Sequence, residues 1–147
     1  MDVVIHHNAA CGSSRNALAI IEAAGYCPIV IDYMSEGWTR PQLLGLFAAA
    51  GKTAREMLRE RETLARYPHL LRDGVTEEEL IAAMVEDPVL VNRPIVCTAK
   101  GVRLCRPAEM VLDLLESWPE GPFSKANGTL LIDAEGNRVP PDGGGRK

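Results

Sequence analysis

The spacing of hydrophobic residues divides the start of the chain into short segments of predictable structure. Val3 to His6 form a run rich in β-branched residues, which predicts a buried strand. After candidate N-caps at Ser13 and Ser14, apolar residues recur at helical spacing until Gly25, a favoured helix end. Pro28 to Tyr33 predicts a second strand. The opening is therefore a β-α-β unit, whose parallel strands are joined by a right-handed crossover.

The middle of the chain is predicted to be helical. Three capping-box signatures, in which a threonine is followed three residues later by Glu or Gln, each open a short amphipathic run. They begin at Thr39, Thr53 and Thr76.

Two further strands and a helix are predicted after this helical region. Pro94 forces an extended conformation on the residue before it and leads into a strand over Ile95 to Thr98. Val102 to Cys105 returns as an antiparallel strand, and Pro107 suits the first turn of the helix that follows. Thr129 to Val139 is a weaker candidate for a hairpin.

The order of elements predicts one α/β domain, in which a βαβ unit is followed by a helical insertion and a ββα unit. A chain of 147 residues with 46% hydrophobic content can bury a single core. We place the domain at residues 1–139 and expect residues 140–147, which are rich in Pro and Gly, to form a disordered tail.

Charge and hydropathy exclude two classes of partner. A net charge of −4 argues against nucleic-acid binding, because affinity for phosphate backbones requires accumulated Lys and Arg. The chain starts without a basic, apolar leader and has no eighteen-residue apolar run, so we expect no membrane segment and no export.

The cysteines indicate a reducing compartment, and therefore the cytoplasm. They have neither the density of a disulfide scaffold nor paired zinc-site spacing. His6 and His7 would point to opposite faces of a strand with no third ligand, so no metal site is expected. Cys27 and Cys97 abut strand runs and are predicted to be core residues. Cys105 could resolve a redox adduct, but a core position is favoured there too.

Cys11 lies where the first predicted strand meets the first predicted helix. Unpaired backbone N–H groups and the helix dipole favour an anion at such a position, and nearby cations lower a thiol pKa. Gly12, the two serines and Arg15 surround it. We therefore interpret Cys11 as a thiolate nucleophile beneath an oxyanion, rather than as an inert buried cysteine.

Two familiar thiol motifs do not fit this loop. A protein-phosphatase loop requires five residues between Cys and Arg, whereas three separate Cys11 from Arg15. A thioredoxin or glutaredoxin redox pair would place a second cysteine at position 14, where this chain has Ser14. Cys11 therefore has no resolving partner in its own loop.

Several segments taken together resemble the glutaredoxin-linked arsenate reductases, and the similarity extends to about residue 139. One departure is Ala9, where family members usually have proline, and we expect it to loosen the approach to Cys11 without removing a chemical group. The similar segments are HNAACGSSRN at 7–16, Leu58-Arg59, NRPIV at 92–96 and RLCRP at 103–107.

The resemblance implies a thioredoxin-like fold and a set of site residues. Cys11 would attack arsenate, and three arginines would bind the oxyanion through bidentate guanidinium groups. Pro94 would lie near the cysteine, in the position of the cis proline found in such folds. The arginines are Arg59, Arg93 and Arg106, and the residues that would stabilise the thiolate are His7, Ser14 and Arg15. From the residues alone, a solvated helix face for Arg59 and a surface position for Arg106 stay open.

The expected activity is reduction of arsenate to arsenite, with glutathione as co-substrate, glutaredoxin as protein partner and no bound cofactor. Two alternatives remain. The first is a thioredoxin-like redox regulator that binds a protein partner, against which Ser14 and the arginines count. The second is a related glutathione-dependent thiol reductase with another substrate.

Overall fold

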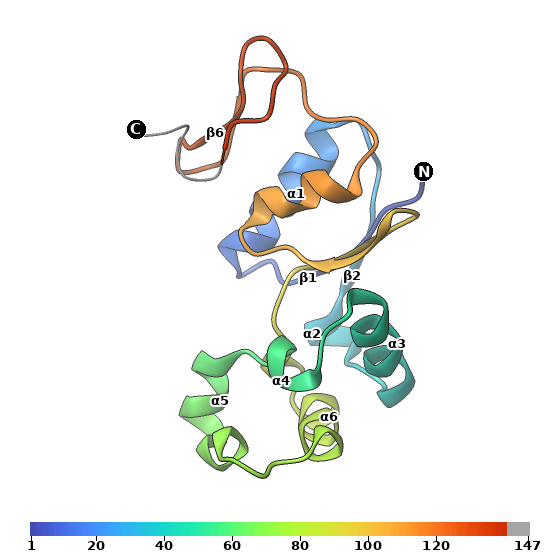
Figure 1. Ribbon diagram of the computed structural model, residues 1–147, viewed down its shortest axis with the longest axis vertical. Coiled ribbons are helices and arrows are strands. Elements are labelled where there is room, and N and C mark those ends of the chain that lie inside the picture. The colour runs from blue at the N-terminus through green and yellow to red at the C-terminus, as the bar shows by residue number, and fades with distance from the viewer. Residues whose placement is uncertain (141–147) are drawn as a thin grey trace.

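The computed structural model describes residues 1–140 and contains strands, α-helices and 3-10 helices (η) in alternation (Figure 1). Their order is β1 (Val4–His7), α1 (Gly12–Ala23), β2 (Ile29–Asp32), α2 (Tyr33–Glu36), α3 (Arg40–Ala50), α4 (Ala54–Met57), α5 (Glu60–Arg66), η1 (Pro68–Leu71), α6 (Glu77–Glu86), η2 (Pro88–Leu90), β3 (Ile95–Thr98), β4 (Gly101–Leu104), η3 (Ala108–Leu114), β5 (Phe123–Ser124) and β6 (Leu130–Ile132).

A four-stranded sheet in the order β2-β1-β3-β4 carries the fold. β1 pairs with β2 in parallel, which confirms the predicted β-α-β opening, and β3 pairs antiparallel with both β1 and β4. His7 lies opposite Asp32 and His6 opposite Ile95, so the ends of β1 and β2 and the start of β3 meet at one edge of the sheet.

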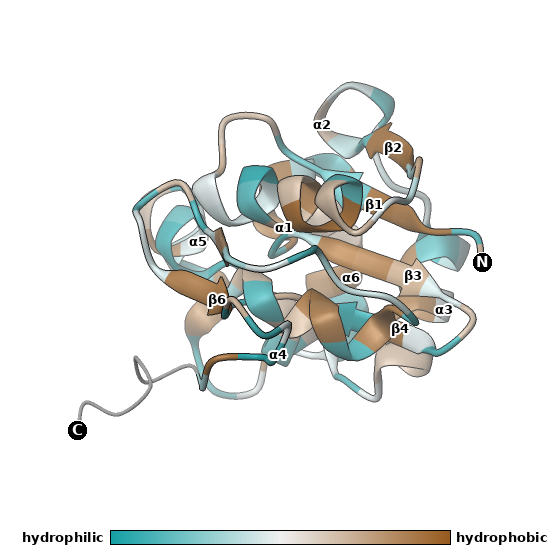
Figure 2. Cartoon of the chain, turned by 90° about the horizontal axis from the view of Figure 1, so that it is seen from above, coloured by the Kyte–Doolittle hydropathy of each residue, from teal (hydrophilic) through white to brown (hydrophobic). Residues whose placement is uncertain are grey.

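The sheet separates two hydrophobic cores (Figure 1). Consecutive residues of β3 face opposite sides, since Ile95 packs with the helical insertion and Val96 packs with α1 and η3. Both are almost fully buried, and β3 and the first part of β1 are coloured as hydrophobic in Figure 2. A sheet covered on both faces explains why β3 begins as a continuous apolar run.

The helical insertion is built as its sequence signals predict. Thr39, Thr53 and Thr76 are the N-caps of α3, α4 and α6, and each forms the complete reciprocal capping box. In each box the threonine hydroxyl accepts the backbone N–H of the Glu or Gln three residues later. The side chain of that Glu or Gln accepts the backbone N–H of the threonine, so two backbone donors of the first turn are satisfied.

The C-terminal part of the domain differs from prediction in two details. The helix expected after Pro107 is the 3-10 helix η3. The predicted hairpin over Thr129–Val139 is present, since Ile132 bridges Arg138 and the Val139 N–H donates to the Leu131 carbonyl at 2.8 Å, but β6 also pairs with β5, which was not predicted. Strand pairing with residues before the predicted segment was not visible in local turn signals.

Cys27 was wrongly predicted to be a core residue and is exposed. It precedes β2, an edge strand of the sheet, in which Ile29 and Val30 are also exposed. An apolar strand at a sheet edge can lack a covering layer, which hydropathy alone does not show.

Apart from Pro140, the tail predicted to be disordered lies outside the described residues. Within residues 1–140, every helix is too short or too polar to cross a membrane.

Candidate active site

A tight loop after β1 places Cys11 at the start of α1. The Asn8 side chain accepts the Ala10 N–H at 3.0 Å, and its carbonyl accepts the Cys11 N–H at 2.9 Å. Cys11 itself is the N-cap, and α1 begins at Gly12. The prediction of Ser13 or Ser14 as N-cap was therefore wrong. The turn that starts at Asn8 ends at Cys11, so the helix begins before the two serines.

Cys11 is only 8% exposed, yet its thiol is acidic. Burial by itself would raise the pKa of Cys11, but it is outweighed by hydrogen bonds. The strongest come from the backbone N–H of Ser14 and the guanidinium of Arg93, and the backbone N–H of Ser13 and the guanidinium of Arg106 add to them. Together they lower the pKa of Cys11 from 9.0 to about 7, so that about half of the molecules carry a thiolate at neutral pH.

Arg106 and Arg93 reach the thiol from the far end of the sequence. Arg106 Nη1 lies 3.7 Å from Cys11 Sγ and donates to the Arg93 carbonyl at 3.0 Å. Arg93 is 7% exposed, and its Nε finds no acceptor among the described residues. The peptide bond between Arg93 and Pro94 is cis. Two guanidinium groups therefore meet at the nucleophile, one of them with an unused donor.

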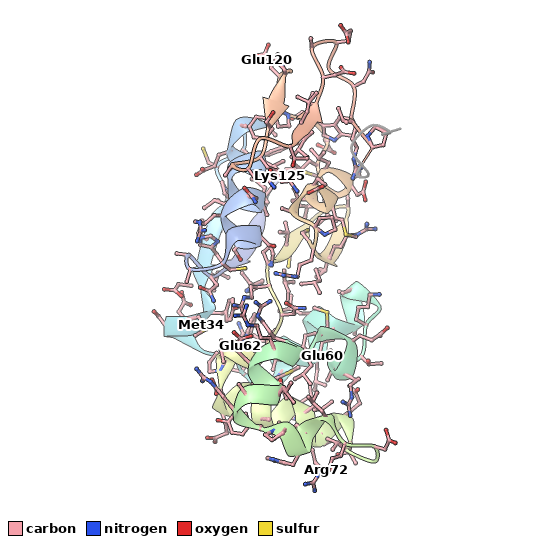
Figure 3. All side chains as sticks on the ribbon, turned by 90° about the vertical axis from the view of Figure 1, so that its left-hand side faces the viewer. Met34, Glu60, Glu62, Arg72, Glu120 and Lys125 are labelled. Atoms are coloured by element: carbon pink, nitrogen blue, oxygen red, sulfur yellow. The ribbon has the colours of Figure 1, made fainter. Side chains whose placement is uncertain are left out.

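Arg59 lies close to this pair but is already bonded. Its Nε donates to Glu62 at 2.7 Å, and its Nη1 donates weakly to Asn92, the neighbour of Arg93, at 3.4 Å. Its side chain is 16% exposed, so it does not lie on a fully solvated helix face. In Figure 3, Glu62 of α5 lies level with Met34 of α2, above Arg72 at the far end of the helical layer.

The three residues expected to stabilise the thiolate are placed differently from one another. Ser14 is fully buried and acts through its backbone N–H, while its hydroxyl accepts the Asn8 N–H at 3.3 Å. Arg15 donates to the Ala9 carbonyl at 2.8 Å and so braces the loop. Burial lowers the pKa of His7, which makes it a neutral imidazole at pH 7 rather than a cation. His7 therefore supplies no positive charge to Cys11.

The other ionisable groups offer no second centre in the described chain. Burial raises the pKa of Cys97, and it raises the pKa of Cys105 to about 12. Within residues 1–140, no group of three or more His, Cys, Asp or Glu side chains is arranged to hold a metal ion.

Tyr33 is a neighbour of the site that sequence reasoning missed. It was predicted only as the end of the second strand, but the charges of Arg93, Cys11 and Arg59 all act on its hydroxyl. The available signal was topological, since residues that follow parallel strands meet at the same edge of the sheet.

The fold and the site define a class of protein. A parallel β-α-β opening, an antiparallel hairpin entered through a cis proline and a cysteine at the start of the first helix are the features of a thioredoxin-like domain. The solved structure of an arsenate reductase from Vibrio cholerae matches with a TM-score of 0.73 at 38% identity, and the match covers 78% of this chain and 98% of the other.

The ArsC family model matches residues 6–114, and the chain belongs to this family. Arsenate reductase ArsI2 of Synechocystis sp. is 62% identical over 137 residues, which cover 93% of this chain and 98% of the relative. An arsenate reductase of Escherichia coli is 40% identical over 138 residues, covering 94% and 98% of the two chains.

Proposed function

We propose that the protein reduces arsenate to arsenite, as the names of its relatives state for them. The observation that carries the proposal is the contact of Arg106 with a Cys11 thiol whose pKa is about 7. A thiolate at neutral pH is a nucleophile, and guanidinium groups beside it bind the oxygens of a tetrahedral oxyanion.

The proposed reaction uses two thiols to deliver two electrons. The Cys11 thiolate bonds to arsenic(V) and displaces one oxygen, which leaves as water after protonation. Glutathione then attacks the adduct, a disulfide forms between Cys11 and glutathione, and arsenic leaves as arsenite, reduced by two electrons. Glutaredoxin attacks the mixed disulfide and returns Cys11 to the thiol.

Within this mechanism we assign the oxyanion to Arg93 and Arg106, with Arg59 adjoining them. Three cations can neutralise a dianion and the charge that develops during displacement. The assignment for Arg59 requires it to loosen its bond to Glu62 when the oxyanion enters.

The remaining residues hold the loop and the thiolate. Ser14 contributes its backbone N–H, Arg15 braces the loop carbonyl at Ala9, and neutral His7 lies at the strand end beside the loop. Pro94 follows Arg93 through a cis peptide bond and precedes β3. Because glutathione and glutaredoxin act in reducing compartments, we also propose a cytoplasmic location.

A coupled assay tests the activity. Purified protein with arsenate, glutathione, glutaredoxin, glutathione reductase and NADPH should consume NADPH at a rate that depends on arsenate. Omitting glutathione or glutaredoxin should stop sustained turnover. No arsenate-dependent consumption would reject the proposal and favour the redox regulator or a reductase with another substrate.

A mass measurement tests whether the second thiol is external. Enzyme quenched during turnover without glutaredoxin should carry one glutathione on Cys11. A triple variant with Cys27, Cys97 and Cys105 changed to alanine should keep turnover if it is folded. A disulfide between Cys11 and Cys105, or a folded but inactive triple variant, would contradict the external thiol.

A further inference from the structure

Tyr33 lies at the point where three strand ends converge on the active site. It follows Asp32, which pairs with His7, so Tyr33 and Asn8 are the next residues beyond two adjacent parallel strands. The antiparallel register of β1 and β3, with His6 opposite Ile95, brings the segment that precedes β3 to the same edge. The sheet thus brings Tyr33 to the same end as the Cys11 loop and Arg93, and the charges of Arg93 and Cys11 act on its hydroxyl.

The hydroxyl of Tyr33 is buried without a hydrogen bond of good geometry. The residue is 1% exposed, and its hydroxyl forms no hydrogen bond of good geometry within residues 1–140, although the Asn8 side chain lies close enough to lower its pKa. Nε of Arg93, whose charge acts on Tyr33, is likewise buried and unpaired. Buried polar groups without partners are rare in native proteins, and each requires an explanation. A guanidinium group can only donate hydrogen bonds. The missing partner of Arg93 Nε, beside the Tyr33 hydroxyl, is therefore an acceptor.

The ring of Tyr33 has a separate structural role. It stacks on Trp38 with ring centroids 5.0 Å apart and belongs to the core beneath the helical insertion. Phenylalanine would keep the ring and its stacking, so packing explains the aromatic ring but not the hydroxyl.

Tyr26 provides the contrast within the same protein. Its hydroxyl accepts the backbone N–H groups of Glu116 and Ser117 at 3.1 and 3.0 Å, far along the chain from its own position. A tyrosine hydroxyl that stabilises the fold forms hydrogen bonds of this kind. The hydroxyl of Tyr33 does not form such bonds.

We propose that the Tyr33 hydroxyl is a further ligand of the oxyanion, donating a hydrogen bond to one oxygen of the tetrahedral anion held by Arg93 and Arg106. This inference rests on the proposed oxyanion site. It adds the uncharged hydroxyl of Tyr33 to the guanidinium groups of Arg93 and Arg106 as a hydrogen-bond donor. The bound anion supplies the missing acceptor for both Tyr33 and Arg93.

The charge state of Tyr33 suits this role. Burial raises the pKa of Tyr33, and the charge of Cys11 adds to the rise. The charges of Arg93 and Arg59 and a weak hydrogen bond with the Asn8 side chain oppose it. The hydroxyl therefore keeps its proton at neutral pH and can donate it in a hydrogen bond, whereas a phenolate would repel the anion.

The test is the variant Tyr33→Phe, read by the protection of Cys11 from alkylation. Bound arsenate should slow alkylation by iodoacetamide, and site-resolved mass spectrometry separates Cys11 from the exposed Cys27. We expect the half-protecting arsenate concentration to rise on the order of tenfold, the loss typical of one hydrogen bond to a charged group. The thermal midpoint without arsenate should stay equal or rise, because the variant removes an unpaired buried hydroxyl.

Tyr26→Phe is the matched control, with the opposite pattern expected. It should lower the thermal midpoint and leave the protection of Cys11 unchanged, since its hydroxyl bonds only to the fold. Unchanged protection in Tyr33→Phe, or a loss of stability like that of the control, would overturn the inference.

The outcomes also separate this inference from the proposed activity. Arsenate turnover by the wild type with unchanged protection in Tyr33→Phe would remove the role of Tyr33 alone. A wild type that is protected through Tyr33 but does not reduce arsenate would reject the activity and keep the anion ligand. A wild type that arsenate does not protect would overturn the inference.

Discussion

Cys11 and Cys105 are both buried, yet their thiols differ sharply in acidity. Their exposed fractions are 8% and 0%, and burial favours the neutral thiol at each. The pKa of Cys11 is nevertheless lowered to about 7, while that of Cys105 is raised to about 12. Burial of a cysteine therefore does not by itself tell whether the thiol is reactive or inert.

The difference lies in the groups that face each sulfur. Cys11 Sγ meets the donor Arg106 Nη1 and the N–H groups of a helix start. Cys105 Sγ instead donates to the Arg103 carbonyl at 3.7 Å, a contact that a thiolate could not make. Arg103 opposes the rise in the pKa of Cys105, but its guanidinium is bonded to Asp113.

The largest expected effect is the loss of turnover in Cys11→Ser. We expect a loss on the order of a thousandfold or more, because a serine hydroxyl is not ionised at neutral pH. Cys105→Ala should keep turnover and lose about 1 kcal/mol in free energy of unfolding, through a small cavity. The coupled assay and urea unfolding measure the two quantities. Equal activity losses in both variants would remove the distinction between the thiols.

The next effect concerns the donors at Cys11. Arg93→Lys and Arg106→Lys keep a charge but lose the planar fork, so each should lose about 1 to 3 kcal/mol of transition-state stabilisation. The pKa of Cys11 should rise in both. Arg40→Lys is the control. Arg40 forms an exposed ion pair with Glu78, so this variant should change neither turnover nor the pKa of Cys11. Steady-state kinetics measure the loss of activity. Full activity in both Arg93→Lys and Arg106→Lys would show that these arginines do not hold the oxyanion.

Alkylation against pH should separate the two thiols directly. Because only the thiolate reacts, the rate at Cys11 should rise to half its maximum near pH 7 and level off above it. Cys105 should stay unreactive throughout this range in the folded protein. Site-resolved mass spectrometry gives both rates from one sample, and a midpoint near 9 for Cys11 would refute the proposed electrostatics.

The smallest effect is on stability, and its sign is opposite at the two cysteines. The pKa of Cys11 is lower in the folded state, so its contribution grows as pH rises from about 7 to 9 and is lost on acidification through 7. The pKa of Cys105 is higher in the folded state, so its contribution is lost as pH rises from 9 toward 12.

Urea unfolding at several pH values measures this difference. The stability gap between wild type and Cys11→Ser should widen in favour of the wild type between pH 7 and 9. The gap for Cys105→Ala should shrink above pH 9. Parallel curves for both variants would mean that neither thiol has a shifted pKa.

Features decided within a few residues were predictable from the sequence by itself. The capping boxes at Thr39, Thr53 and Thr76, the strand runs and the cysteine at a helix start rest on bonds that span three or four positions. The family resemblance extended this local reading to the arginines and named them as a group.

Only the tertiary structure decided what surrounds each of these side chains. The bond from Arg106 to Cys11 joins residues 95 positions apart, and the edge position of β2 leaves Cys27 exposed. Tyr33 reaches the site through strand register, which no local pattern encodes. The physical reason is that the pKa of a thiol and the pairing of a hydroxyl depend on neighbours in space, and the sheet alone sets which strand ends become neighbours.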